Sequence, residues 1–260
     1  MRGIAVDRSD PPSHWDREAD VVVIGSGATG LPAAIVAHEA GASVIIVETQ
    51  PHIGGHAITS GGNLPLGGGT SYQKKYGIDD SPDLFFRDLT DWSVVENNGF
   101  PPYRYNDREI IRAFADNSAA AFEFLLAHGV KMVEKAPDNG SGHEIGISAL
   151  RTMHCAVMDW PMTQTGKPAD PGVQASTSSG NGLMPPLHAA ARKAGVEIFL
   201  EHRMTSIHRE SPNAGRVLGI AVDHSGAALN IRAGKAVIIA TGGSSGNVNF
   251  RRMFDPRLTE

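Results

Sequence analysis

Three runs of apolar residues without polar alternation stand out along the chain. They are residues 20–24 (DVVVI), 43–47 (SVIIV) and 235–241 (KAVIIAT). Such runs are typical of central parallel strands that are covered on both faces. We therefore predict a central parallel sheet, and we expect residues 196–200 to form a further strand.

Segments with helical spacing and end signals lie between these runs. Ser81-Pro82-Asp83 is a good helix start, and Asn106 or Asp107 can cap a longer helix that ends at Gly129. The longer helix has an apolar stripe that we expect to pack in the core: Ile111, Phe114, Phe122 and Leu125. The predicted helices are residues 28–39, 81–92, 107–128 and 183–193.

Turn residues divide the later part of the chain into short extended segments. Residues 204–210, 216–223 and 228–232 are separated by SPNAG and HSG, which predicts an antiparallel β-meander. Residues 49–71 and 134–180 are rich in glycine, serine and threonine, and we expect no regular helix or strand there. A long loop of this kind in a compact domain is usually functional or disordered, and we favour a loop that lies along a ligand at residues 49–71.

The first strand opens into the glycine turn GSGATG at residues 25–30. Gly25 allows the chain to turn sharply, Gly27 lets a pyrophosphate approach the backbone, and Gly30 lets the next helix lie close to the sheet. The start of that helix directs free N–H groups and a positive dipole end at the phosphates. Strand, turn, helix and second strand in this register predict a dinucleotide-binding βαβ unit rather than a purely structural one.

Glu48 follows the second strand, eighteen residues after Gly30. This is where a dinucleotide-binding fold places the acid that binds the adenosine ribose. A carboxylate at this position would repel a 2′-phosphate, which argues against NADP.

Charge and composition exclude several classes of function. The formal net charge of −5 gives no basis for binding nucleic acid. A single cysteine, Cys155, excludes disulfides and iron–sulfur clusters within the chain, and the eleven histidines show no metal-binding spacing, so we expect no metal. Because no signal peptide or membrane span is recognisable, we expect a cytoplasmic protein. The oligomeric state is left open.

A second glycine-rich turn, Gly242-Gly243-Ser244-Ser245-Gly246, follows the strand at residues 235–241. Both glycine turns are expected at the carboxyl edge of the sheet, where such folds bind ligands. The turn also matches the G-x-S-x-G motif of hydrolases. That triad needs a histidine after the serine, and none occurs after His224, which excludes a hydrolase.

Together these motifs resemble the flavoprotein subunits of the fumarate reductase and succinate dehydrogenase family, which includes 3-ketosteroid dehydrogenases. The resemblance rests on GSGATG with Glu48, on GGHAITSGG at residues 54–62, and on three longer segments. These are GIDDSPDLFFRDL, NDREIIRAFADNSAAAFEFLLAHGV and GKAVIIATGGSSGNVNFRRMFDPRL. It implies an α/β, Rossmann-like FAD-binding domain over residues 20–260, with a small antiparallel meander, after a flexible lead-in of residues 1–19.

The resemblance implies FAD as the cofactor and assigns residues to it. Glu48 would bind the adenosine ribose, with Thr49 and Gln50 lining the nucleotide edge, and Met204 would meet the adenine through its backbone. The pyrophosphate would be held by Gly25, Ser26, Gly27, Ala28, Thr29 and Gly30. The flavin would be lined by Gly54, Gly55, His56, Ser60, Gly61 and Gly62. The late turn of the family would be formed by Ala240, Thr241 and Gly242.

His56 has two possible roles. It could donate a hydrogen bond to the pyrophosphate or ribose, or it could carry the flavin covalently, as a histidine in the matching loop does in some members of the family. Five residues separate the glycine pairs Gly54-Gly55 and Gly61-Gly62, as in the steroid branch, which favours the hydrogen-bonding role.

The resemblance also implies a reaction: hydride transfer between flavin N5 and a carbon–carbon bond beside a carboxylate or ketone of a small-molecule substrate. Fumarate reductase-like chemistry is the first hypothesis. A 3-ketosteroid dehydrogenase and a truncated, non-catalytic FAD-binding remnant are the alternatives. In the family, the capping domain and the proton donor follow the region matched here, so no catalytic residue is assigned.

Overall fold

The computed structural model describes residues 12–90, 107–140, 148–156, 180–211, 214–243 and 247–254. The chain divides into two compact units, described separately below. Unit 1 combines residues 1–56 with residues 188–260, and unit 2 comprises residues 57–187. The expected FAD-binding domain, residues 20–260, therefore includes all of unit 2 and the part of unit 1 after residue 19, and its extent as a functional domain stays a prediction.

Unit 1 is built on a six-stranded sheet with strand order β5-β2-β1-β8-β7-β6. Neighbours from β5 to β8 pair in parallel, whereas β8, β7 and β6 pair antiparallel. The strands are β1 (Arg17–Ile24), β2 (Val44–Val47), β5 (Glu197–Phe199), β6 (Arg203–Ser211), β7 (Ala214–His224) and β8 (Ala227–Ile239). The predicted α/β class, with a central parallel sheet and a small meander, is confirmed.

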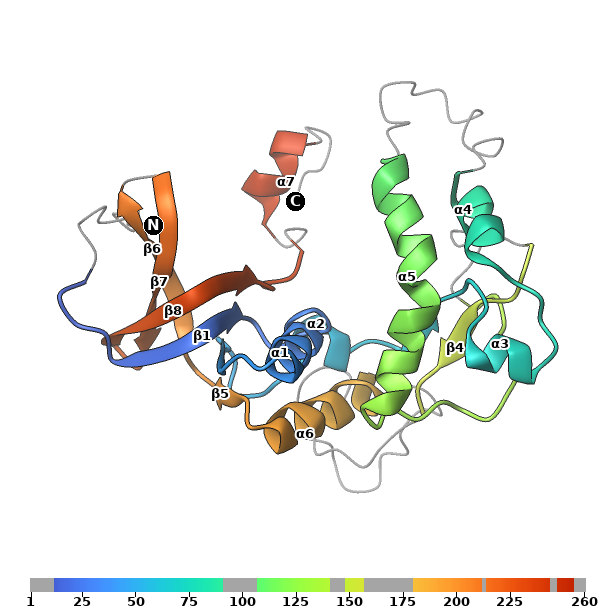
Figure 1. Cartoon of the computed structure of the whole chain (residues 1–260), viewed down its shortest axis with the longest axis horizontal. Coiled ribbons are helices and arrows are strands. Elements are labelled where there is room, and N and C mark those ends of the chain that lie inside the picture. Colours follow the sequence, from blue (N-terminus) through green and yellow to red (C-terminus); the bar gives the residue numbers. More distant parts are fainter. Residues whose placement is uncertain are drawn as a thin grey trace. The chain divides into compact units, whose positions relative to one another are not determined.

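Strand β8 corrects one detail of the prediction. Residues 228–232 and 235–241 were expected to be two strands, yet one strand runs through both (Figure 1). Residues 227–232 of β8 pair antiparallel with β7, and residues 231–239 pair in parallel with β1. The partners of Ala19 and Val21 are Ala233 and Ala236, so β8 has one residue more than β1 between these pairs. This β-bulge, at Gly234, lies where the sequence pattern indicated the end of a strand.

The core of unit 1 consists of aliphatic side chains on the strands. Helix α1 (Gly30–Glu39) packs on β1 and β2, as the βαβ prediction requires. Helix α6 (Met184–Ala194) ends at Gly195, which has a φ of +102° that favours glycine. The last described helix is α7 (Val248–Phe254). The core cluster contains Ala19, Val22, Ile24, Ile45, Val47, Ile220, Val222, Ile231 and Ala233.

The sheet begins within the stretch assigned to a lead-in. Strand β1 starts at Arg17, and the backbone N–H of Asp16 donates to the Asn230 carbonyl over 2.8 Å. The Trp15 ring packs edge-on against His208. Residues 15–19 are thus part of the sheet region of unit 1.

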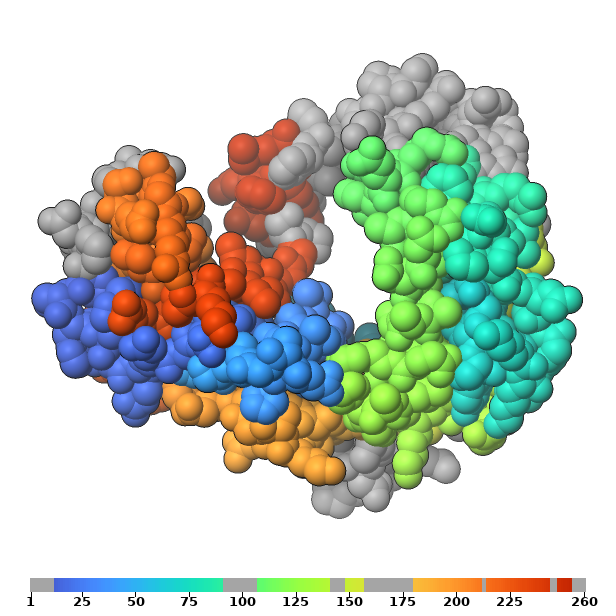
Figure 2. Space-filling view, in the orientation of Figure 1, coloured from blue at the N-terminus to red at the C-terminus, as the bar shows by residue number. Residues whose placement is uncertain are grey.

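Unit 2 contains two helices that pack along each other, α4 (Pro82–Thr90) and α5 (Arg108–Ala127), and their side chains meet in Figure 2. Both start at the predicted caps: the Ser81 hydroxyl accepts from the Leu84 N–H, and Asp107 accepts from two N–H groups of the first turn of α5. Residues 91–106, between these two helices, lie outside the described residues.

Two segments expected to lack regular structure contain short elements. Residues 49–71 include α2 (Gly55–Ile58) and β3 (Asn63–Pro65), and α3 (Ser71–Lys75) begins at their end. Residues 134–180 include β4 (Thr152–His154), which pairs antiparallel with β3. Strands of three residues are too short to show alternation, so no periodic pattern could have predicted them.

The apolar stripe of α5 is only half buried. Phe122 and Leu125 lie in the core, as expected. Ile111 is partly buried, whereas Phe114 is 43% exposed although its ring contacts Phe85, so the expectation of core packing was wrong for Phe114. None of the helices in the described part of the chain combines the length and hydropathy needed to cross a bilayer.

Candidate functional site

The turn between β1 and α1 is tightly packed at two of its three glycines. Gly25 has a φ of +102°, and a Cβ there would lie 2.4 Å from the Ala240 carbonyl oxygen. A Cβ on Gly30 would lie 1.8 Å from the Gly25 carbonyl oxygen. Only glycine fits either position without moving the backbone.

Gly27 differs from both. The nearest atom to a Cβ at this position is the Gly54 carbonyl oxygen, 3.9 Å away, which is ordinary van der Waals contact. The fold itself therefore does not require glycine at residue 27. A glycine that packing does not explain, directly before the ten-residue helix α1, leaves room for a ligand at the backbone.

The two glycine turns lie at the same edge of the sheet. Ile24 and Ile239 are paired at the ends of β1 and β8, and the Ala240 N–H donates to the Ile24 carbonyl over 2.8 Å. Figure 1 shows β1 and β8 side by side, with their arrowheads at the same end. Beyond Ala240, Thr241 and Gly242 are exposed, and Gly242 has a φ of +81°. The prediction that these turns share the carboxyl edge is confirmed.

Glu48 is held rigidly at the end of β2. Its Oε2 accepts from the backbone N–H and the hydroxyl of Ser26, over 2.9 and 2.6 Å, and its Oε1 accepts from the Gln50 N–H over 2.9 Å. The residue is only 7% exposed. A carboxylate has about four acceptor positions. Three are in use, which leaves one for a hydroxyl of a ligand.

The loop around Gly54 lies against the first glycine turn. The Gly54 N–H donates to both the carbonyl and the hydroxyl oxygen of Ser26, each over 3.2 Å. A Cβ on Gly55 would lie 3.7 Å from the Gly27 Cα. The next residue, His56, is exposed. Part of the loop expected to follow the ligand is therefore placed beside Gly27.

Ser60, Gly61 and Gly62 belong to unit 2, and their placement beside a flavin stays a prediction. The Ser60 carbonyl accepts from the Gly180 N–H over 2.9 Å, and the Ser60 hydroxyl accepts from the Gly62 N–H over 3.2 Å. A Cβ on Gly61 would meet nothing within 4 Å. Hydrogen bonds therefore hold this turn in place, and there is space for a side-chain-sized group at Gly61.

The remaining predicted positions surround Glu48. Thr49 and Gln50 are exposed, and the Gln50 carbonyl accepts from the Glu201 N–H at the start of the turn that leads to β6. Met204 is the second residue of β6 and packs against the core of the sheet. Its expected backbone contact with adenine stays a prediction.

A family model described as an FAD binding domain matches residues 20–259. The chain belongs to this FAD-binding domain family. FAD, the cofactor inferred from the motifs, is therefore the cofactor of its family. The glycine turn, the end of β2 and the late turn after β8 are all within the matched region.

Known relatives of this FAD-binding domain are oxidoreductases. The chain is 28% identical to an NADH:fumarate oxidoreductase of Klebsiella pneumoniae, over 88% of the chain and 21% of the relative. It is 28% identical to an acrylate reductase flavoprotein subunit of Shewanella woodyi, over 98% of the chain and 45% of the relative. The chain spans less than half the length of these two proteins.

A solved structure shows the same fold. The 3-ketosteroid-Δ4-(5α)-dehydrogenase of Rhodococcus jostii, in complex with 4-androstene-3,17-dione, matches with a TM-score of 0.72 and 29% sequence identity. The match covers 95% of this chain and 50% of that one. Fumarate reductases and ketosteroid dehydrogenases are thus both homologues of this FAD-binding domain, as the motifs indicated.

Two further reactive side chains in the described part of the chain, Cys155 and His154, have structural surroundings. Burial raises the pKa of the Cys155 thiol to about 12, so this thiol is protonated at neutral pH. His154 instead contacts the Asp138 carboxylate over 3.0 Å. Within the described residues, no group of three or more histidine, cysteine or acidic side chains could hold a metal ion.

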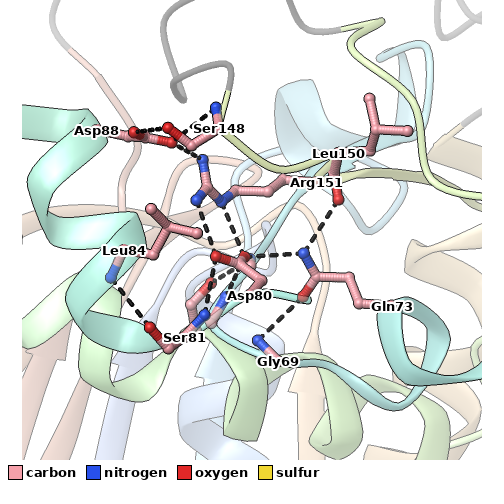
Figure 3. Close-up of polar contacts among 12 residues, drawn as sticks. Gly69, Gln73, Asp80, Ser81, Leu84, Asp88, Ser148, Leu150 and Arg151 are labelled. Carbon is pink, nitrogen blue, oxygen red and sulfur yellow. Dashed lines mark hydrogen bonds and ion pairs between the residues drawn. The ribbon is translucent and has the colours of Figure 1, made fainter. Parts of the chain in front are cut away.

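One buried polar cluster was not predicted from the sequence. Arg151 is fully buried and contacts the carboxylates of Asp80 and Asp88, as Figure 3 shows. The acidic residues are 71 and 63 positions away from Arg151 in the chain, and Arg151 lies in a stretch without periodic pattern. No spacing signal could have connected them.

Proposed function

We propose that this chain is the FAD-binding part of an oxidoreductase that transfers hydride between flavin N5 and a carbon–carbon bond next to a carboxylate or ketone. One observation carries the proposal: Gly27 is left open between the closely packed Gly25 and Gly30, at a sheet edge that also presents Glu48. The family match supports FAD as the ligand.

Each part of the sheet edge has a role in this proposal. The turn from Gly25 to Gly30, including Ser26, Ala28 and Thr29, cradles the pyrophosphate, and the backbone N–H groups of residues 27–30 are the donors. Because the N–H and hydroxyl of Ser26 already donate to Glu48, its role is to orient that carboxylate toward the ribose. Bound FAD supplies the hydride chemistry, and the chain supplies its position and surroundings.

The late turn and the adenine end complete the proposed cradle. Ala240, Thr241 and Gly242 border the pyrophosphate from the end of β8, while Thr49, Gln50 and Met204 border the adenosine. His56 hydrogen-bonds the cofactor in this proposal, which is supported by its exposure and by its position after Gly54 and Gly55, the neighbours of Gly27. Acid precipitation should then release free FAD, and flavin retained on the denatured chain would indicate a covalent link.

The substrate is proposed as a small α,β-unsaturated acid, because the first relatives are a fumarate oxidoreductase and an acrylate reductase. A 3-ketosteroid is the second candidate. It is favoured by the structural match to a ketosteroid dehydrogenase and by the five-residue spacing between the two glycine pairs.

Reduction and reoxidation of the flavin test this function. The purified protein should take up FAD, and dithionite should bleach the visible flavin band. Reoxidation by fumarate or acrylate in the absence of oxygen would support the first substrate class. Reoxidation only by an unsaturated 3-ketosteroid would support the second. A protein that stays colourless after incubation with FAD would refute the proposal.

A further inference from the structure

Two histidine rings of unit 1 are stacked on each other. The rings of His202 and His224 are nearly parallel, with an interplanar angle of 16° and ring centres 4.3 Å apart. The centre of the Phe199 ring lies 5.3 Å from that of His202. Phe199 ends β5, His202 directly precedes β6 and His224 ends β7, so three segments of unit 1 meet at this stack.

Each histidine ring is oriented by a hydrogen bond to a backbone carbonyl. His202 Nδ1 lies 2.7 Å from the Leu200 oxygen, and His224 Nδ1 lies 3.2 Å from the Glu201 oxygen. Because a carbonyl oxygen can only accept, Nδ1 carries the proton of each neutral ring. A proton that is added in acid must then go to Nε2, where it gives the ring a full positive charge.

No carboxylate is paired with the stack to balance two such charges. The charged residues on the segments around it are Glu48 after β2, Glu201 in the turn, Arg203 on β6 and Asp223 on β7. In the described part of the chain, none of these carboxylates forms an ion pair with either ring, and that of Glu48 is bonded to Ser26 and Gln50. Two positive charges about as close as these ring centres repel each other. The stack therefore tolerates one added proton better than two.

The turn between β5 and β6 connects the stack to Glu48. The His202 N–H donates to the Glu48 carbonyl over 2.8 Å, and the Glu201 N–H donates to the Gln50 carbonyl over 3.1 Å. The Gln50 N–H is in turn one of the three donors that hold the Glu48 carboxylate. A movement of the turn at residues 200–202 would therefore displace the residues that fix this carboxylate.

The backbone of this turn depends on its neighbours. Glu201 has a φ of +58°, in the left-handed region that is unfavourable for a residue with a side chain. Such a conformation persists where surrounding contacts hold it. Two of these contacts are the bond from the Glu201 N–H to Gln50 and the bond from His224 to the Glu201 carbonyl. Separation of the stacked rings would remove the second.

We propose that His202 and His224 form a pH-sensitive element that weakens FAD binding in acid. Protonation of both rings drives them apart, frees the turn at residues 200–202 and loosens the Glu48 carboxylate from its fixed position. The effect is smallest near pH 8 and grows as the pH falls through the range in which histidine gains its charge, about pH 5–8. This inference rests on the proposed function, because it takes Glu48 as the acid that binds the ribose of FAD.

FAD affinity at about pH 8 and about pH 5.5, measured well below the unfolding temperature, tests this element. His224→Asn keeps a side-chain N–H for the Glu201 carbonyl without a titrating ring, and His224→Phe keeps a stacked ring without the charge. Coupling between two sites is typically worth roughly 5- to 150-fold. We expect the ratio of the dissociation constants at the lower and the higher pH to be larger by that factor in the wild type than in either variant.

His14→Gln is the matched control, because it removes an exposed histidine of the same unit. It should show the same ratio of dissociation constants as the wild type. His56 is another histidine beside the proposed pyrophosphate, and a charge on it would strengthen binding in acid, which is the opposite sign. The variants are therefore compared with the wild type at both pH values. The same ratio in the wild type, His224→Asn and His224→Phe would overturn the inference.

Amide hydrogen exchange provides a second test that needs neither FAD nor a variant. In the empty wild-type protein, the protection of the Glu201 and His202 N–H groups, corrected for intrinsic exchange rates, should fall between about pH 8 and about pH 5.5, while the amides of β1 stay protected. Equal protection of the two turn amides at both pH values would overturn the inference even if no variant folds.

The two tests separate failure of this inference from failure of the proposed function. Wild-type protein that binds no FAD at either pH would refute the proposed function, and with it the role of the stack in cofactor binding. Wild-type protein that binds FAD but has the same ratio of dissociation constants as the His224 variants would refute only the pH-sensitive element.

Discussion

Gly27→Ala separates the requirements of the fold from those of the ligand. A Cβ at residue 27 would have its nearest neighbour, the Gly54 carbonyl oxygen, at 3.9 Å, and the backbone there is outside the left-handed region. The empty protein should therefore accept alanine. The free energy of unfolding should change by less than about 1 kcal/mol, and it can increase because alanine restricts the unfolded chain.

The same methyl group would occupy the space in which we place the pyrophosphate. Inserting a methylene-sized group into a filled site costs about 1–3 kcal/mol. At about 1.4 kcal/mol for each factor of ten, FAD should bind roughly 5- to 150-fold more weakly. Titration of the protein with FAD, followed by flavin fluorescence, measures the dissociation constant, and thermal unfolding without FAD measures the fold.

Two results would refute this reasoning. Wild-type FAD affinity in a folded Gly27→Ala protein would mean that the pyrophosphate does not pass this backbone. Loss of folding in the absence of FAD would mean that the open space at Gly27 is needed by the fold, and the argument for a ligand there would fail.

Three further predictions follow from burial and packing. Gly30→Ala should lower the free energy of unfolding by more than about 3 kcal/mol, because its Cβ would lie 1.8 Å from the Gly25 carbonyl oxygen. Thermal unfolding measures this change, and a variant as stable as the wild type would contradict it. The folded pKa of Asp80 lies below the ordinary 3.8, so its contribution to the free energy of unfolding is fully present above pH 3.8 and is lost as the pH falls through the folded pKa. Acid unfolding curves of Asp80→Asn should lack this loss of stability. An acid dependence equal to that of the wild type would refute the stabilising role of the Asp80 charge. Cys155 should resist a thiol reagent near neutral pH until the protein is denatured, since it is buried and its pKa is about 12, and rapid labelling of the native protein would show that it is accessible.

The βαβ unit and its ligand edge could be predicted because their causes are local. The apolar run of β1, the three glycines and the position of Glu48 each follow from short-range rules, and the structure places them together. Even here, the pairing of Ser26 with Glu48 was not foreseen, because a serine in a glycine turn has several possible partners.

Features that depend on distant pairing could not be predicted. Strand β8 was divided in two at Gly234 because a glycine in a strand resembles an end, while the bulge opposite Asp20 is visible only when β1 and β8 are paired. The pairing of β3 with β4 and the burial of Arg151 against Asp80 likewise depend on contacts between segments far apart in sequence.

A crystal structure of the protein with bound FAD tests the central claim most directly. The account predicts pyrophosphate oxygens within hydrogen-bonding distance of the backbone between Gly27 and Gly30, with a ribose hydroxyl donating to the free acceptor position of Glu48 and the chain after Ala240 alongside. FAD bound elsewhere, with the Gly27 backbone and Glu48 free of ligand, would contradict it.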